Sequence, residues 1–500
     1  MQKRRLGISL YPERSTFEQD VAYLEKAAKL GFDLLFIALL GAGDRQQTID
    51  RYKPLLAKAK ELGFEIEADV NPMMFERMGI NATLQSIDFG RLRDFRVSTV
   101  ETMTKGLTGL LAHRGVTVFR GCAALQNAHT VRVTPAEGET QVSRSVEAGV
   151  FEPVETELAI DADDIVLATG SRPLALPGNP FAGALIDSTQ ALELNTLPSS
   201  AVIIGAGAVA LEFASLWNAA GCEVTLLIRK DRVLSTWERR ASMTLTRELK
   251  RRGVNVIART AVDRVDTGAN LGATVHYRQG DSDEDRTAYG EVVLAAIGRV
   301  PNTDADWFRS SGLKLDERGY VTVDGYGRTN LDGVWALGDI TPGHALAHRA
   351  FEQGITIAEK IAGADPKPVI DDTVPQVVFS FPEAASVGLT LDQAKAREDV
   401  VEPKETAYPM LSNARMLMSG EGGSMTVVSG AFANNPDMQV VLGVHIVSPI
   451  ASDLIAEAEQ LVGNRVPLAD AARLIHPHPT FSETLGEALL KADGRPLHTR

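Results

Sequence analysis

The stretch Ala201–Lys230 constrains the fold of this chain more than any other. A short apolar run, Val202–Ile204, is followed by Gly205 and Gly207, by a segment with helical periodicity and by a second apolar run, Val224–Ile228. This order predicts a strand, a glycine turn, a helix and a second strand, which form one βαβ unit. Phosphate groups bind at the first turn of such a helix, because free N–H groups and the helix dipole favour anions there. The stretch is therefore a candidate dinucleotide-binding site.

Each small residue of this motif has a separate role. Gly205 permits the tight turn, Gly207 lets backbone N–H groups approach a pyrophosphate, and Ala210 must be small for the helix to pack on the strand. An ordinary βα turn is the alternative interpretation. The strand–helix–strand context favours dinucleotide binding over it.

The residues after the second strand bear on which nicotinamide cofactor binds. NAD sites place an acidic residue on the ribose 2′-hydroxyl about 20 residues after the glycines. Here Ile228 is followed by Arg229, Lys230 and Arg232. Cations at this point suit the 2′-phosphate of NADP(H), while solvated surface charges are the alternative.

The composition excludes several classes of protein. With 500 residues the chain has room for two to four domains, and its net charge of −14 argues against a nucleic-acid or anionic-membrane partner. Its apolar runs are too short to span a membrane, and no secretory signal or metal site is expected. The two cysteines, Cys122 and Cys222, form no disulfide framework, which favours a cytoplasmic location.

Residues 1–80 alternate between strand and helix patterns. We expect strands at 5–10, 33–39 and 64–70, and helices at 16–30, capped by Ser15, and at 44–62. Short loops between βα units indicate parallel strands, but a closed (β/α)₈ barrel needs eight such units.

The remainder of the chain mixes several patterns. A helix is expected at 97–114, and residues 165–173 are expected to form a buried strand that ends in a glycine turn, with Gly170 in this stretch. A second strand is expected within 334–339 and ends at Asp339, whose carboxylate could alternatively cap a helix. A helix follows at about 346–362, a linker at 365–368 and a mixed α+β region at about 370–500.

Residues 1–80 resemble the start of the TIM-barrel 6-phospho-N-acetylmuramidases, through GISLYPERSTFEQDVAYLEKAAKLGF and FEIEADVNPMMFERMGI. The resemblance implies that Glu13, Glu67, Asp69 and Asn71 lie at catalytic strand ends. Activity as a sugar-phosphate glycoside hydrolase is therefore one alternative function. It would require the missing barrel strands, so solvated loop residues are the favoured interpretation.

Residues from about 80 to 500 resemble the pyridine nucleotide-disulfide oxidoreductases, in particular the dihydrolipoamide dehydrogenase branch. The stretches that carry this resemblance occur in the family's order: ETMTKGLTGLLAHRGV, VLATGSRP, VIIGAGAVALEFASLW, AAIGRVPN, TNLDGVWALGD, ALAHRAFEQGI, PEAASVGLT and LIHPHPTFSETLGEALL. They imply an α/β reductase fold with two dinucleotide-binding domains and an α+β C-terminal dimerisation domain. The implied bounds are 81–198 with 299–365 for an incomplete FAD domain, 199–298 for the NAD(P) domain and 370–500 for dimerisation.

The resemblance also assigns site residues. FAD would contact Gly170, Asp339 and Ala347, and Glu212 would face the junction of nicotinamide and flavin. NAD(P) would be lined by Val262 and by the segment from Ala296 through Gly298 to Arg299. His478 and Glu483 would form an acid/base pair that reaches the partner's flavin site in a homodimer, since histidine can shuttle a proton and a carboxylate fixes its tautomer. The family also implies association with a 2-oxoacid dehydrogenase complex.

The chain departs from the family pattern in two respects. It lacks the N-terminal strand–GxGxxG–helix that holds the FAD pyrophosphate, and it lacks the Cys-x4-Cys pair that accepts electrons from flavin. We expect weaker FAD binding and no lipoamide turnover, so the ancestral activity is impaired. A non-catalytic or diaphorase-like nucleotide-binding dimer is an alternative. The join near Met78–Asn81 suggests a chimera, whether natural, engineered or an assembly error.

Overall fold

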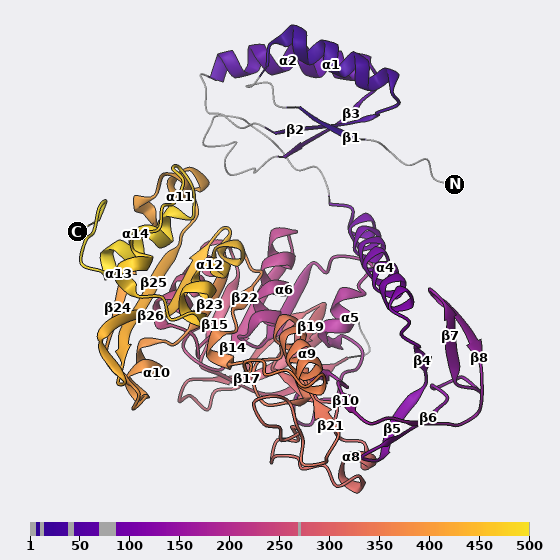
Figure 1. The fold of residues 1–500 in the computed structure, drawn as a ribbon. Helices are drawn as coiled ribbons and strands as arrows, with labels where there is room; N and C mark the ends of the chain where they lie inside the picture. The colour runs from indigo at the N-terminus through magenta and orange to yellow at the C-terminus, as the bar shows by residue number, and fades with distance from the viewer. Residues whose placement is uncertain (1–6, 11–14, 39–44, 70–86, 269–271, 500) are drawn as a thin grey trace. The chain divides into compact units, whose positions relative to one another are not determined.

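A computed structural model describes residues 7–10, 15–38, 45–69, 87–268 and 272–499 (Figure 1). The chain divides into two compact units. The first comprises Met1–Ile87 with Met418–Gly420, and the second comprises Asp88–Leu417 with Glu421–Arg500. The predicted join at Met78–Asn81 lies outside the described residues.

The first unit is a small parallel α/β layer. Strands β1 (Gly7–Leu10), β2 (Leu34–Ala38) and β3 (Glu65–Asp69) pair in parallel in the order β1-β2-β3, and helices α1 (Phe17–Lys29) and α2 (Arg45–Glu61) cover one face (Figure 1). Leu24, Leu35 and Leu55 form its buried centre. Barrels and open doubly wound sheets share this strand order, so the unit does not identify a barrel.

The second unit opens with helix α4 (Phe89–His113), which begins earlier than the predicted Val97. Asp88 caps it, since its Oδ1 accepts a hydrogen bond of 3.0 Å from the Arg91 N–H. None of the residues of α4 is buried, which explains why apolar periodicity did not reveal its first turns. Two antiparallel sheets follow, β4-β7-β8 and β5-β6-β9, made of β4 (Phe119–Arg120), β5 (Cys122–Asn127), β6 (Thr130–Thr134), β7 (Ser143–Glu147), β8 (Val150–Pro153) and β9 (Leu158–Asp161).

Two strand pairs bring distant turns of the chain together. Strand β10 (Ile165–Leu167) pairs in parallel with β21 (Val334–Ala336), and β11 (Ser171–Pro173) pairs antiparallel with β20 (Arg299–Pro301). The turn after β21 is the 3₁₀ helix η2 (Gly338–Ile340), and helix α9 (Ala347–Ile361) follows. Because β10 and β21 are parallel, their carboxyl ends meet at one edge. Helix α8 (Asp306–Ser310) packs nearby.

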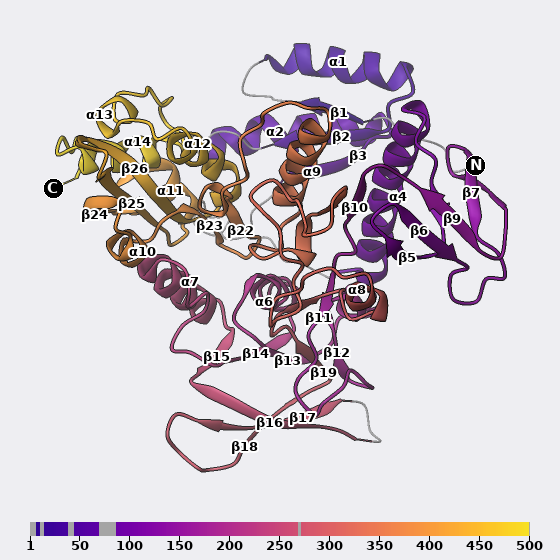
Figure 2. The ribbon, with the colours of Figure 1, turned by 60° about the horizontal axis from the view of Figure 1, so that its bottom comes forward.

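A five-stranded parallel sheet forms the centre of the second unit, in the order β12-β19-β13-β14-β15. Helix α6 (Ala208–Ala219) and helix α7 (Arg239–Arg251) cover one face, and the three-stranded sheet β16-β17-β18 lies on the other (Figure 2). Burial from both sides accounts for the continuous apolar runs of β13 and β14. The elements are β12 (Leu185–Ile186), α5 (Ser188–Leu192), β13 (Ser200–Ile204), β14 (Glu223–Ile228), β15 (Asn255–Ala258), β16 (Thr260–Thr267), β17 (Ala273–Gln279), β18 (Arg286–Gly290) and β19 (Val292–Ala295).

The C-terminal part is an antiparallel sheet of order β22-β23-β26-β25-β24 with helices packed on it. Strand β26 runs from Asn435 to Ser448, well beyond the predicted 440–446. Its elements are η3 (Asp371–Thr373), β22 (Gln376–Val378), β23 (Glu383–Gly388), α10 (Leu391–Ala396), β24 (Val400–Tyr408), η4 (Met410–Ser412), α11 (Ala414–Ser419), β25 (Ser424–Phe432), β26 (Asn435–Ser448), α12 (Ala451–Gly463), α13 (Leu468–Ala471) and α14 (Glu483–Ala492).

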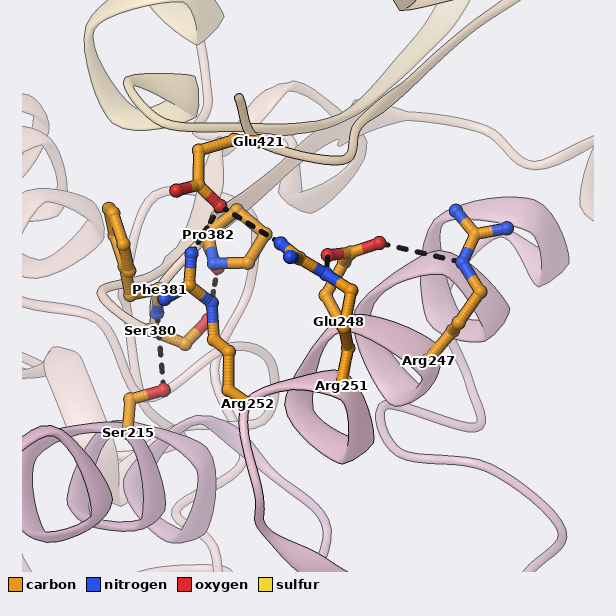
Figure 3. A network of polar contacts seen from close by, with 9 residues as sticks. All are labelled: Ser215, Arg247, Glu248, Arg251, Arg252, Ser380, Phe381, Pro382 and Glu421. Carbon is orange, nitrogen blue, oxygen red and sulfur yellow. Dashed lines mark hydrogen bonds and ion pairs between the residues drawn. The ribbon is translucent and has the colours of Figure 1, made fainter. Parts of the chain in front are cut away.

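A buried charge network joins helix α7 to this C-terminal sheet (Figure 3). The Glu421 carboxylate, in a side chain only 1% exposed, pairs with Arg252 and with Arg251. Arg251 Nε also donates to Glu248 Oε2 at 2.7 Å, and the Arg252 guanidinium lies 4.0 Å from the Phe381 ring centroid. These contacts tie the parallel sheet and the antiparallel sheet into one unit.

We predict that Glu421→Ala destabilises the chain, because it leaves the Arg252 guanidinium without its buried counter-charge. Loss of one partner from a buried ion pair costs about 3–5 kcal/mol of unfolding free energy. Arg247 also contacts Glu248, at 3.5 Å, but its side chain is 69% exposed, so Arg247→Ala is the matched control and should cost less than about 1 kcal/mol. Thermal unfolding of the two variants checks this. Equal shifts in Tm would contradict the assigned role of Glu421.

Candidate dinucleotide-binding site

The turn after β13 needs a glycine at its first position. Gly205 has φ +143°, and a Cβ there would lie 2.2 Å from the Ala296 carbonyl oxygen. The same Cβ would lie 3.4 Å from the side chain of Ala210, which is fully buried and packs against the turn. The close passage of the segment after β19 therefore explains the glycine at the first of the three small positions of the motif.

Helix α6 begins with its N-terminal groups open. Its N-cap is Gly207, which makes no side-chain capping hydrogen bond, and its first turn contains no acidic residue. The first N–H groups of a helix lack partners within the helix, and the helix dipole makes this end partly positive. The end of α6 can therefore bind a pyrophosphate.

A cavity of about 690 Å³ lies at this helix end. Its volume is within the range of small-molecule and cofactor sites. Pro173, Leu174 and Ile297 contribute to an apolar wall, and Arg229 and Lys230 bring positive charge. The full lining is Pro173, Leu174, Leu176, Pro177, Ser188, Ile204, Gly205, Ala206, Gly207, Ala208, Val209, Leu227, Arg229, Lys230, Ser235, Thr260, Ala261, Val262, Ala295, Ala296, Ile297, Gly298 and Arg299.

Most residues predicted for the nicotinamide cofactor gather at this cavity. Those that line it are Gly205, Gly207, Arg229, Val262, Ala296 and Gly298, and Ala210 packs beneath the turn. Glu212 does not line the cavity. Its Oε1 accepts a hydrogen bond of 3.0 Å from the Phe379 N–H, and burial raises the pKa of its carboxyl. The structure therefore places Glu212 against the loop after β22.

The residues predicted for flavin lie at a second turn. Gly170 immediately precedes Ser171, whose Oγ donates to Asp339 Oδ2 at 2.5 Å. The Gly338 N–H donates to Gln353 Oε1 at 2.9 Å, which fixes the turn against α9. Ala347 is the exposed first residue of that helix. Sequence reasoning missed Ser171, although its position directly after a strand-ending glycine is a signal for a site residue.

The N-terminus of α1 is unlike that of α6. Thr16, and not the predicted Ser15, is the N-cap, and Thr16 and Gln19 form a reciprocal capping box. Glu18 and Asp20 add two carboxylates to the first turn. The Thr16 side chain occupies the Gln19 N–H and the two carboxylates repel anions, so this helix end is less suited to a pyrophosphate than that of α6.

His478 and Glu483, which the sequence predicts to be an acid/base pair, lie in hydrogen-bonding contact. The ring Nδ1 lies 2.8 Å from Glu483 Oε1, and the Thr480 N–H donates to Oε2 at 2.9 Å. Slight burial acts to raise the pKa of Glu483, but these hydrogen bonds outweigh it and the pKa lies below its usual value. The carboxylate thus holds the Nδ1–H tautomer and leaves Nε2 of the exposed ring as a base.

The two cysteines lie in different environments. Cys122 is exposed in β5, whereas Cys222 is buried and burial raises its pKa to about 11. Neither forms a disulfide. Among the described residues no group of three or more His, Cys, Asp or Glu side chains could hold a metal ion, and no described helix is long and apolar enough to cross a membrane.

Comparison with family models gives two matches. The pyridine nucleotide-disulphide oxidoreductase model matches residues 24–354, and the dimerisation domain of the same family matches residues 374–489. The second match supports a homodimer formed through the C-terminal part. The first begins inside the N-terminal unit, and the resemblance of residues 1–80 to a TIM-barrel hydrolase gains no support. Of the residues which that resemblance singled out, Glu13 and Asn71 lie outside the described residues.

Sequence comparison with individual proteins also finds similar members of this family. Dihydrolipoyl dehydrogenase of Geobacillus stearothermophilus is 35% identical over 429 residues, covering 85% of this chain and 84% of the relative. The enzyme of that name from Chlamydia pneumoniae is 31% identical over 425 residues, covering 85% of each.

Two solved structures share the fold. LpdA from Mycobacterium tuberculosis superposes with a TM-score of 0.68 at 24% identity, covering 98% of this chain and 100% of that one. The HOCl-induced flavoprotein disulfide reductase RclA from Escherichia coli gives 0.68 at 21% identity, covering 97% and 99%.

We predict different effects for alanine at the two glycines of the turn. Gly205→Ala should lower both Tm and nucleotide affinity, because its Cβ collides with the Ala296 carbonyl. A Cβ at Gly207 would have no protein atom within 4 Å, so Gly207→Ala should keep the wild-type Tm. It should lower only the nucleotide affinity, because the added methyl group obstructs the approach of the nucleotide. Thermal unfolding and NADPH titration measure the two properties. Loss of stability in Gly207→Ala would contradict this account.

The family match extends over most of the chain, and the Geobacillus relative is aligned over more than four-fifths of its own length. The predicted reductase fold is therefore confirmed. Use of FAD and NAD(P) is a property of this family, and the cavity at α6 fits the pyridine nucleotide. The chain belongs to the pyridine nucleotide-disulphide oxidoreductase family.

Proposed function

We propose that this chain is a pyridine-nucleotide-linked oxidoreductase of the dihydrolipoyl dehydrogenase type that binds NADP(H) and has lost lipoamide turnover. The observation that carries the proposal is the open end of α6 beside a cavity of about 690 Å³. NADPH supplies a hydride when it is bound. Gly205 and Gly207 would let the backbone approach its pyrophosphate, and the N-terminus of α6 would offset its charge.

The charges after β14 favour NADP(H) over NAD(H). Arg229 and Lys230 both line the cavity and are exposed. Arg232 differs, because its guanidinium pairs with Asp231 at 2.9 Å and donates to the Ser235 carbonyl at 3.1 Å. Two cations without a fixed carboxylate partner in the described part of the chain would attract the dianionic 2′-phosphate, whereas the hydroxyl of NADH would gain little.

We predict that NADPH binds more tightly than NADH, by about tenfold or more, since charge-assisted hydrogen bonds contribute about 1.5–3 kcal/mol. The double variant Arg229→Ala/Lys230→Ala should lose this preference with little change in NADH affinity. Arg232→Ala is the matched control and should retain it. Titration of tryptophan fluorescence with both nucleotides provides the dissociation constants. A preference for NADH in the unmodified chain would refute the proposal.

Features of each unit, taken by itself, support an impaired activity. In the first unit, the N-terminus of α1 has a capping box and two carboxylates, which disfavour a pyrophosphate. In the second unit, Asp339 accepts a hydrogen bond from Ser171 at the turn expected to contact flavin. The free cysteines are an exposed Cys122 and a buried Cys222 with a raised pKa, and the sequence has no Cys-x4-Cys pair. A dithiol that could pass electrons to lipoamide is therefore missing, and FAD should bind more weakly than in the relatives.

We predict that the purified chain shows little or no flavin absorbance and does not reduce lipoamide. Visible spectroscopy of the protein, before and after incubation with excess FAD, and a lipoamide assay with NADH and NADPH measure these properties. A bound flavin with reduction of an artificial acceptor, but not of lipoamide, would indicate a diaphorase-like activity that fits the missing dithiol. Lipoamide reduction by the pure chain would refute the assignment.

The C-terminal part would supply pairing and proton transfer. In a homodimer, Glu483 would hold His478 Nδ1 and leave Nε2 free to exchange a proton with a thiol, but without the dithiol this thiol partner is missing. Association with a 2-oxoacid dehydrogenase complex, which the resemblance to this family implies, is a further part of the proposal. Co-purification with such a complex would test it independently of catalysis.

A further inference from the structure

Two hydrogen bonds in series link the nucleotide cavity to Asp339. Arg299 lines the cavity, and its Nε donates to Ser171 Oγ at 2.7 Å. Ser171 Oγ donates in turn to Asp339 Oδ2 at 2.5 Å. Asp339 itself does not line the cavity, so the serine is the contact between two separate parts of the site.

The donor and the acceptor of each of these two hydrogen bonds follow from the chemistry of the groups. The guanidinium Nε–H can only donate and the carboxylate can only accept, so the single hydroxyl proton of Ser171 must point to Asp339. Hydrogen bonds arranged in series polarise one another, and those to charged groups are the stronger ones. A change at Asp339 therefore alters the acceptor strength of the Ser171 oxygen that Arg299 contacts.

The backbone holds all three groups in place. Strands β11 and β20 pair so that Pro173 lies opposite Arg299, and Arg299 Nη2 donates to the Ser171 carbonyl at 2.7 Å. On the other side Gln353 holds the Gly338 N–H, and Thr341 Oγ1 donates to the Gly338 carbonyl at 2.8 Å. Removal of the Ser171 hydroxyl leaves only the contact of Arg299 Nη2 with the Ser171 carbonyl, so the guanidinium loses one of its two contacts with Ser171 and is less firmly oriented.

We infer that Ser171 is a positioning residue that couples Asp339 to Arg299, so that a change at Asp339 alters the affinity for NADPH. This inference rests on the proposed nucleotide binding at the α6 cavity. In the unmodified chain the Ser171 contact keeps the Arg299 guanidinium oriented at the cavity wall. Without the contact, the guanidinium is less ordered before the nucleotide binds. The free-energy cost of ordering it on binding then lowers the affinity for an anionic nucleotide.

The experiment is a double-mutant cycle on NADPH binding. Ser171→Ala and Asp339→Ala should each weaken NADPH binding about three- to tenfold. The double variant should bind NADPH no more weakly than the single variants, because both substitutions interrupt the same series of hydrogen bonds. Ser171→Thr retains the hydroxyl and should restore near wild-type affinity. Arg172→Ala is the matched control on the same strand, since Arg172 pairs with Asp304 at 2.9 Å and does not line the cavity.

Each outcome decides a separate question. Additive losses, or single variants with unchanged affinity and unchanged Tm, would overturn the coupling while leaving nucleotide binding intact. Failure of Ser171→Thr to restore affinity would also overturn it. An unmodified chain with no measurable NADPH binding would overturn the proposed function and the coupling with it.

Discussion

The close passage of the Ala296 carbonyl beside Gly205 is the constraint on which the rest of the site depends. Because β13 and β19 are hydrogen-bonded neighbours, the segments that leave them run close together, and only a glycine fits between them. This approach brings Gly298 and Arg299 to the same cavity as the start of α6, whose N-cap Gly207 has no side-chain capping hydrogen bond. The dinucleotide site is thus a consequence of strand pairing as much as of the glycine motif.

The N-termini of α1 and α6, which follow β1 and β13, show how local chemistry separates a structural helix end from one that can bind an anion. Both α1 and α6 follow a strand in a parallel sheet, yet α1 carries a capping box and two carboxylates while α6 begins with an uncapped Gly207. The helix dipole has the same direction in both, but only α6, of these two helices, begins without a side-chain cap and without carboxylates that oppose an anion. The same supersecondary unit is therefore a structural layer in one place and a candidate cofactor site in the other.

Charge has two roles in the second unit. Buried in the network around Glu421, it stabilises the junction between the parallel and antiparallel sheets, where desolvation makes an unpaired group costly. Exposed at Arg229 and Lys230, it remains available to a ligand. In the contact from Asp339 through Ser171 to Arg299, a single hydroxyl joins a carboxylate to the cavity wall. Burial and existing partners, and not residue type, separate the structural charges from those that can bind.

The sequence by itself determined the βαβ unit, the small residues at Gly205 and Ala210, the cations after β14 and the spacing of His478 and Glu483, because these patterns are local and have direct steric or chemical causes. Only the tertiary structure decided that Glu212 contacts the Phe379 N–H and that Ser171 joins Asp339 to Arg299. Those features depend on pairings between segments far apart in the chain, whose register no local pattern records.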